Sequence, residues 1–439
     1  MRMMDNAGFW RFSIACLLLL AMTVPQAAHA QSANSVVTYR MVRGDTLYSI
    51  DNRFLSGGDS IAAIARINGI TNPNRIPVGT VIRLPRDMLA WRNAGLVVRS
   101  FSGPVNIDGS APQVGMSVQE GSVIRTGMNG FVSFQSADGA TVALPSNSHA
   151  RLERARIYRL RDLRDIEFRI LGGRGAVQAP VLREEERFRT STPVAVTAVR
   201  GTQYRVAYDE TTGRSISEIV EGTVSVETET SAQLASQGFG VAVTSAGIGG
   251  LEQLLPAVTI TEPGAIQTEE IVSFALSPPE GAMGARTQIA RDAGFLEMIA
   301  QDVSGDGIAT FEGLPDGRYF IRSRPISSNG IEGLSDTFSF RRKRLGAQAA
   351  VEASPIADGF RFAWLPQGEG ITYFAFQLWQ QGAAGTPLYD EIALPGSATV
   401  VTGLEPGTYV WRIAAIQADA EDGLLKVWGP EQSLIVSEE

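Results

Sequence analysis

The chain has 439 residues, a formal net charge of −8 and 44% hydrophobic residues, with one cysteine and two histidines. This length is too great for one hydrophobic core and predicts about three domains. The acidic balance disfavours nucleic acid as the main partner. Because the single cysteine, Cys16, lies within an apolar run near the start, the sequence also argues against disulfides, thiol catalysis and thiolate metal sites.

Residues 1–30 have the layout of a secretory signal peptide. Arg2 and Arg11 come first, the apolar run IACLLLLAMTV follows, and the small-residue motif AHA ends at Ala30. The run is shorter than the roughly 20 residues that span a bilayer, so we expect cleavage near Ala30 rather than a retained anchor. The sequence therefore predicts an exported protein of the periplasm or cell envelope.

Residues 37–85 predict a small α+β module in the order strand, helix, helix, strand. The stretch YRMVRGDTLYSI changes from an alternating to a helical spacing in its middle. Asp45 or Thr46 can cap the first helix by accepting hydrogen bonds from its free amides. Asp59 or Ser60 can cap a second helix. The turn-rich stretch NGITNPNRIPVGT then leads into a closing strand, TVIRLP.

These stretches resemble a LysM domain. The resemblance covers the whole module and rests on the motifs Gly-Asp-Thr-Leu, Asn-Gly-Ile, Asn-Pro-Asn and Val-Gly. It implies binding to glycans that contain N-acetylglucosamine, which in a bacterium means peptidoglycan. The family's groove corresponds to two loops here, with these candidate glycan-binding residues: Gly44, Asp45, Thr46, Leu47, Ile70, Thr71, Asn72, Pro73 and Ile76.

The same loop residues also have a purely structural interpretation. A glycan needs backbone donors and acceptors beside a glycine, and a small apolar floor for its N-acetyl methyl group. Alternatively, Gly44 and Asp45 only build the corner, while Leu47 and Ile76 only fill the core. Asp51 stands where the family usually has alanine.

Residues 95–230 predict an all-β domain, either a sandwich or a barrel-like fold. Short alternating strands are separated by glycine turns, and no long amphipathic helix interrupts them. In the hairpin FVSFQSADGATVALP, Val132 and Phe134 point to one side, and Asp138 and Gly139 form the turn.

The segments GSVIRTGMNGFVSFQSADGATVAL, TPVAVTAVRGTQYRV and EIVEGTVSVE, in this order, resemble a FecR domain. Family members named for the role act in iron-uptake signalling, with a cytoplasmic anti-sigma region and a membrane span before the periplasmic part. This sequence shows neither, so the resemblance implies the extracytoplasmic β fold rather than the transmembrane role.

Two features of this domain have competing interpretations. Eight arginines lie between Arg151 and Arg174, and they could form a patch for anionic wall polymers or lipid headgroups. Acidic residues are interleaved with them, so we expect a solvated strand face instead. His149 is predicted at a turn, without a metal or catalytic role.

Residues 231–256 are predicted to form a glycine-bearing connector, and the chain then repeats itself. Gly313, Leu314, Gly317 and Tyr319 precede Gly403, Leu404, Gly407 and Tyr409 by 90 residues. The repeat predicts two β-sandwich domains in tandem, at 257–345 and 350–437, which resemble fibronectin type III or related immunoglobulin-like modules.

Two charged motifs in this region are predicted to have no binding role. DVSGDGIATFEG resembles a calcium loop, but Gly313 occupies the twelfth position where an EF-hand needs a bidentate glutamate, and strands flank it. We therefore expect a β-turn there. The RRKR segment, residues 341–344, is predicted to be a solvated linker.

The sequence as a whole predicts a multidomain, mainly β protein without catalytic residues, metal ligands or cofactors. Wall amidases and peptidases need several histidine or carboxylate ligands, and wall transpeptidases need a cysteine nucleophile. A glycosidase needs only two carboxylates, so composition alone leaves that class open. We expect a cell-envelope protein that binds peptidoglycan and contacts envelope proteins. The alternative is a periplasmic sensor that signals through its FecR-like domain to a membrane partner.

Overall fold

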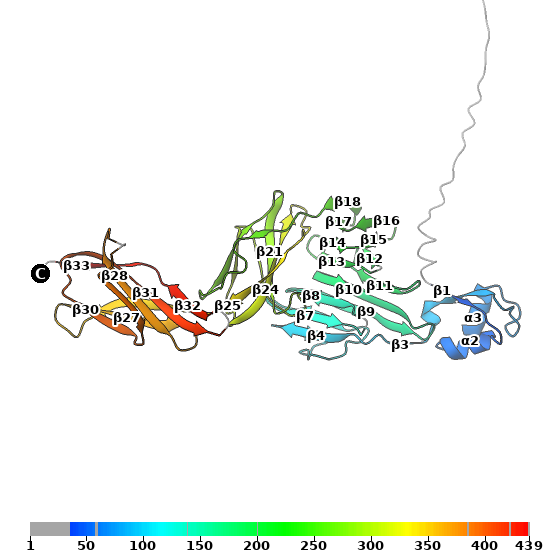
Figure 1. Ribbon diagram of the computed structural model, residues 1–439. Helices are drawn as coiled ribbons and strands as arrows, with labels where there is room; N and C mark the ends of the chain where they lie inside the picture. The colour runs from blue at the N-terminus through cyan, green and yellow to red at the C-terminus, as the bar shows by residue number, and fades with distance from the viewer. Residues whose placement is uncertain are drawn as a thin grey trace, which may run out of the picture. The chain divides into compact units, whose positions relative to one another are not determined.

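The computed structural model describes residues 36–57, 60–137, 139–199, 201–383, 386–420 and 423–437. The predicted signal peptide, Asp59 and Asp138 lie outside these residues. The fold is mainly β, and the chain divides into two compact units (Figure 1). The first module lies in one unit, except for Asn52–Ser56, which belong with the chain from Leu89 onward. Within the described ranges, no helix has both the length and the apolar character to cross a membrane.

The first module has the predicted order of strand, helix, helix and strand. Its elements are β1 (Val36–Arg40), α2 (Leu47–Phe54), α3 (Ser60–Ile67) and β2 (Val81–Pro85), followed by a 3-10 turn, Arg86–Met88. β1 and β2 pair antiparallel. Both helices bury one apolar face, and the core includes Val37, Leu47, Ile50, Ile64, Ile82 and Leu84.

Thr46, rather than Asp45, caps α2. Its hydroxyl oxygen accepts a hydrogen bond from the Ser49 amide at 3.1 Å, and the Ser49 hydroxyl oxygen accepts one from the Thr46 amide at 2.9 Å. This reciprocal pair satisfies two backbone donors at the helix start. The Asp45 carboxylate instead accepts hydrogen bonds from the Tyr39 hydroxyl and the Val42 amide, and so closes the corner between β1 and α2.

The second module is a hydrogen-bonded network of 16 strands. In chain order these are β3 (Trp91–Asn93), β4 (Val97–Ser102), β5 (Val105–Ile107), β6 (Val123–Thr126), β7 (Phe131–Gln135), β8 (Thr141–Leu144), β9 (His149–Tyr158), β10 (Leu163–Gln178), β11 (Arg187–Ser191), β12 (Val196–Val199), β13 (Gln203–Asp209), β14 (Arg214–Glu221), β15 (Thr223–Glu227), β16 (Ala232–Ser236), β17 (Phe239–Thr244) and β18 (Gly247–Gln253). The predicted hairpin is confirmed, because Val132 pairs with Leu144 and Phe134 with Val142.

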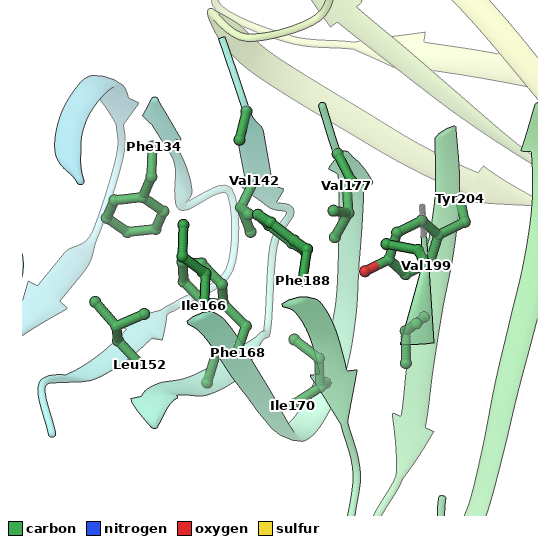
Figure 2. Packing of buried hydrophobic residues seen from close by; sticks show 14 of the residues in the cluster. Phe134, Val142, Leu152, Ile166, Phe168, Ile170, Val177, Phe188, Val199 and Tyr204 are labelled. Carbon is green, nitrogen blue, oxygen red and sulfur yellow. The ribbon is translucent and has the colours of Figure 1, made fainter. Parts of the chain in front are cut away.

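The long strand β10 connects the two halves of this network. Its first part pairs with β9 and, in parallel, with β11, and its last part pairs with β8 and β13. Gly173, with a φ of 75°, lies between these parts, and a Cβ atom there would lie 2.3 Å from the Asn147 carbonyl oxygen. Figure 2 shows the buried core of the module, where side chains from β7 to β13 gather, including Phe134 and Phe168.

Residues 231–256 are not a connector, and that prediction was wrong. They contain β16, β17 and β18, which extend the network by pairing with β15, β14 and β17. Val241 and Val243 alternate with polar or small residues and are buried in the same core, which is the physical reason that this glycine-rich stretch forms strands. The second module therefore extends from Trp91 to Gln253.

Two β-sandwiches follow. The first consists of β19 (Thr259–Ile260), β20 (Val272–Ser277) and β23 (Ile308–Phe311) facing β22 (Met298–Ser304), β21 (Ala282–Ala290), β24 (Gly317–Ser327) and β25 (Thr337–Arg342). The second consists of β26 (Gly346–Ala353), β27 (Gly359–Gln367) and β30 (Ala398–Thr402) facing β29 (Tyr389–Leu394), β28 (Tyr373–Gln380), β31 (Gly407–Asp419), β32 (Gly423–Trp428) and β33 (Gln432–Val436). Each sandwich has its own aromatic core.

The sequence repeat corresponds to a repeated structural device. Tyr319 lies on β24 and Tyr409 on β31, and both are buried. The Tyr319 hydroxyl donates to the Pro315 carbonyl at 2.9 Å, and the Tyr409 hydroxyl donates to the Glu405 carbonyl at 2.8 Å. Each tyrosine thus ties its strand to the turn four residues earlier.

The RRKR segment is not a solvated linker. Arg341 and Arg342 end β25, and Arg342 is 2% exposed. The Arg342 guanidinium donates to the Gln267 carbonyl at 2.8 Å, and Arg341 pairs with Asp419 of the second sandwich at 2.5 Å. Arg342 can be buried because its guanidinium donates to backbone carbonyls, and the other three residues of the run are partly buried.

The arginines of β9 and β10 match the expected solvated face only in part. Arg169 pairs with Glu153, as interleaved charges predict, whereas Arg156 pairs with Glu120 outside the segment. Asp165, however, is fully buried. The Arg174 side chain contacts the first sandwich instead, where it donates to the Gly330 carbonyl oxygen at 3.1 Å.

The second module and the first sandwich share buried contacts. Phe131 and Ala143 of the module pack with Ala290, Phe295 and Met298 of the sandwich. In a second cluster, Ile331 of the β24–β25 loop packs against Ala207 and Ile216 of the module and against Leu254, which directly follows it.

The polar centre of this contact is the interdomain arginine cluster, which comprises Arg174, Arg205, Arg286, Arg322 and Arg324 around the carboxylates of Glu218 and Glu332. Both carboxylates are at most 1% exposed. Arg205 Nε lies 2.6 Å from Glu218 Oε2, and Arg286 Nε lies 2.6 Å from Glu332 Oε1. The Glu332 backbone amide donates to Glu218 Oε1 at 2.7 Å, so the Glu218 carboxylate binds both an arginine and a backbone amide.

Replacing Tyr319 or Tyr409 by phenylalanine should destabilise its own sandwich by about 1 kcal/mol, because each change removes one buried hydrogen bond without changing the packing. Chemical denaturation of the full chain, followed by hydrogen exchange in β24 and β31, measures both effects. Tyr373→Phe is the control, since Tyr373 is 45% exposed. A loss as large in Tyr373→Phe would contradict the assignment.

Glu332→Gln should cost about 3 kcal/mol of unfolding free energy, since it leaves buried arginines without their carboxylate. Burial opposes ionisation, but Arg174, Arg286, Arg324 and Arg205 together hold the pKa of Glu332 well below its usual range. The carboxylate therefore stabilises the contact above its normal pKa, and this contribution disappears as the pH falls through the lowered value.

The control for this variant is Glu352→Gln, which removes an exposed pair with Arg361 and should cost less than about 1 kcal/mol. Urea unfolding at pH 7 and at acidic pH compares the two variants with the wild type. Equal losses in both variants would show that Glu332 does not hold the domains together.

Candidate functional site

The two loops that carry the candidate residues lie against each other in the first module. The Leu47 amide at the start of α2 donates a hydrogen bond to the Pro73 carbonyl oxygen at 3.1 Å. Neighbouring bonds brace the arrangement, because Met41 and Thr80 pair through the backbone at 2.9 Å and the Gly79 amide donates to the Met41 carbonyl at 2.8 Å. The loop before α2 and the loop before β2 thus form one surface.

The candidate residues differ in exposure. Gly44, Thr71 and Asn72 are exposed, and Leu47 is only 1% exposed. The remaining candidates are partly buried: Asp45, Thr46, Ile70, Pro73 and Ile76. The Leu47 side chain therefore belongs to the core, as the structural interpretation held, while its amide joins the loops.

Several backbone groups of this surface are open to solvent. Gly44 has a φ of 93°, a conformation that favours glycine, and a Cβ atom added there would meet nothing within 4 Å. Among the described residues, none accepts a hydrogen bond from the amides of Gly44, Thr71 or Asn72. Exposed amides beside small side chains suit hydroxyl and acetamido oxygens as acceptors.

Asn68 and Asn72 fix the second loop from within. The Asn68 side chain donates to the Ile64 and Arg83 carbonyls, both at 2.9 Å, and accepts from the Arg83 amide at 2.7 Å. Asn72 Oδ1 accepts from the Asn74 amide at 3.0 Å. The Asn72 side-chain oxygen thus shapes its own turn.

Two residues of this module were not among the predicted site residues. Asp51 accepts a short hydrogen bond from the Ser60 hydroxyl and so joins α2 to α3, which explains how a carboxylate replaces the small residue usual in the family. Tyr48 follows Leu47 and is 65% exposed. An aromatic residue next to the helix start was the available signal, but the helical spacing alone did not place Tyr48 on the outer face.

The described part of the chain offers no cluster of metal-ligating side chains. No group of three or more His, Cys, Asp or Glu residues there could hold a metal ion. In the stretch DVSGDGIATFEG, the Asp302 carboxylate accepts a hydrogen bond from the Thr310 amide. The Asp306 carboxylate accepts one from the Ile308 amide, as carboxylates in turns do. Burial and the Arg125 charge lower the pKa of His149, the first residue of β9.

Comparison with known proteins identifies two of the modules. Residues 39–85 match the LysM domain, and residues 122–225 match the FecR protein family. No curated protein matches the chain.

Solved structures resemble parts of the chain at low identity. A candidate anti-sigma factor from Parabacteroides distasonis is 17% identical, with a TM-score of 0.26, over 30% of this chain and 59% of that chain. The FN1–FN3 domains of chicken CNTN1 are 11% identical, with a TM-score of 0.23, over 61% of this chain and 99% of that chain. The fibronectin(III)-like modules of Clostridium thermocellum CbhA are 13% identical, with a TM-score of 0.19, over 41% of this chain and 94% of that chain.

The two family matches fall on the first and second modules of the structure. The LysM match coincides with the strand, helix, helix, strand module, and the FecR match lies inside the larger network of Trp91 to Gln253. The chain therefore contains a LysM domain and a FecR domain, followed by two β-sandwiches in tandem.

Proposed function

We propose that this protein is a non-catalytic cell-envelope protein that binds peptidoglycan through its LysM domain. The observation that carries the proposal is the hydrogen bond between the Leu47 amide and the Pro73 carbonyl, which joins the two candidate loops into one surface. In this proposal the open backbone of Gly44, Thr71 and Asn72 contacts the sugar, and partly buried Ile70 and Ile76 receive the N-acetyl methyl group.

The charge of the LysM domain supports this partner. Residues 36–88 contain seven arginines and four aspartates, a formal charge of +3, whereas the whole chain carries −8. Peptidoglycan presents free carboxylates on its peptides, so this domain is the part of the chain that the wall attracts. Screening by salt should weaken the attraction without abolishing the contacts to the sugar.

The other domains serve as scaffold or interaction surfaces in this proposal. Export by the predicted signal peptide, with cleavage near Ala30, would place them in the periplasm or elsewhere in the envelope. A single LysM domain supplies weak binding, about 4 to 8 kcal/mol for dissociation constants between millimolar and micromolar.

A second candidate function is regulatory. The FecR match over residues 122–225 favours it, because that family takes part in signalling with membrane partners. Crosslinking in whole cells separates the two functions. A membrane protein crosslinked to the FecR domain favours regulation, and recovery with the wall alone favours the scaffold.

Gly44→Ala should weaken co-sedimentation of the full chain with isolated sacculi at least fivefold, because the new methyl group strains the loop backbone and projects from the surface that we assign to the glycan. The dissociation constant is measured from the pelleted fraction at increasing sacculus concentration. Digesting the sacculi with a muramidase should release the wild type.

Gly57→Ala is the matched control for this experiment. Gly57 has a φ of 89° and, like Gly44, open space around its Cβ position, but it lies in the turn after α2 rather than in either candidate loop. Both variants should lose similar stability, and only Gly44→Ala should lose affinity. Equal wall binding by both variants, or no binding by the wild type, would refute the assigned surface.

A further inference from the structure

The interdomain arginine cluster holds more positive than negative charge. Of its five arginines, Arg174, Arg205, Arg286 and Arg324 lie within ion-pair distance of the two carboxylates, those of Glu218 and Glu332. Asp292 is farther away, and its oxygens already accept the Leu296 and Glu297 amides at 3.2 and 2.7 Å. Asp336 lies at the exposed mouth of the adjacent cleft. Even with both aspartates counted, a formal charge of +1 remains on a largely buried site.

Arg322 is the least compensated member of the cluster. Its Nε and Nη2 atoms donate to Gln288 Oε1 at 3.0 and 2.9 Å, and its guanidinium carbon lies 3.8 Å from the centre of the Phe295 ring. Throughout the described ranges, no carboxylate lies within ion-pair distance of this side chain. A neutral amide and an aromatic face hold the group in place without neutralising it.

Arg324 is nearly as poorly compensated. It is 6% exposed, and its one ion pair with a described residue joins Nη1 to Glu332 Oε2 at 3.4 Å. Its Nε atom is buried and has no hydrogen-bond acceptor among the described residues. Leaving a buried donor of a charged group unpaired costs free energy, which an acceptor in this position would recover.

Three arginines of the cluster line a cleft and a small cavity. A cleft of about 440 Å³ between the second module and the first sandwich is lined by Arg205, Arg322 and Arg324, and also by Gln178, Gln203 and Thr337. The same three arginines border a smaller cavity of about 20 Å³, which is large enough for one water molecule. The larger cleft has the volume of a small-molecule site.

The pKa shifts of Arg322 and Arg324 agree with this geometry. Burial, with the neighbouring charges of Arg324 and Arg205, lowers the pKa of Arg322 well below its usual range. Burial and Arg205 lower the pKa of Arg324 to about 9. The protonated cluster is therefore under electrostatic strain that a bound anion would relieve.

We propose that the cleft between the FecR domain and the first sandwich binds a small oxyanion, a phosphate or a carboxylate, through Arg322 and Arg324. Guanidinium groups match the paired oxygens of both anions. Because one wall of the cleft belongs to each domain, the anion also strengthens the contact between them.

Thermal unfolding of the full chain tests the proposal, in Tris buffer at pH 7.5 and constant ionic strength. Inorganic phosphate and malonate are each compared with sodium chloride. Phosphate or malonate should raise the midpoint by about 2 °C or more, since ligand binding to the folded state stabilises it. Calorimetric titration should give one site per chain, and the stronger anion identifies the preferred group. No gain over chloride with either anion overturns the proposal.

Variants locate the site. Arg322→Gln and Arg324→Gln should each weaken anion binding at least tenfold. Arg361→Gln, which changes a partly exposed arginine of the second sandwich, should leave it unchanged. Arg322→Gln is the variant expected to fold, because it removes excess charge and breaks no ion pair. In the absence of the anion it should therefore keep or raise the midpoint. Undiminished binding by Arg322→Gln overturns the assignment, whatever happens to Arg324→Gln.

Discussion

The buried carboxylate of Glu332 is the interaction on which the arrangement of the larger unit depends. It lies on a loop of the first sandwich, yet Arg174, which binds it, belongs to the FecR domain. A carboxylate removed from water needs partners at once, so this loop can be buried only when both domains are folded and in contact. The apolar contact of Ile331, next to it in the chain, gains its burial from the same event.

Local patterns in the sequence were sufficient to predict much of the fold. Alternation at Val132 and Phe134 predicted a hairpin, and the repeated Gly-x-Tyr turns predicted two sandwiches, because such signals act over a few residues. Contacts between distant segments leave no such signal. The parallel pairing of β10 with β11, the strands at 231–256 and the burial of Arg342 all depend on which surface lies opposite. For the last two segments, composition alone favoured a linker.

The candidate glycan site shows the same division. The positions of the loops came from the resemblance to LysM domains, and the structure adds the hydrogen bond that joins them. Sequence reasoning could not decide between Asp45 and Thr46 as the cap, since both have the required chemistry. Only the geometry assigns the helix amide to Thr46 and the corner to Asp45. Likewise, the apolar spacing of Leu47 fits a floor for a ligand and a core position equally well.

The last strands of the FecR domain have a consequence for how this chain can be divided. β16 pairs with the outer edge of β15, and β17 pairs with that of β14. A fragment that ended at residue 230 would therefore leave β14 and β15 with unpaired backbone amides and carbonyls along one side. Exposed strand edges of this kind pair readily with other chains. A fragment cut at the apparent domain boundary would therefore aggregate for reasons unrelated to its hydrophobic core, whereas one that continued through Gln253 would keep β14 and β15 paired on both sides.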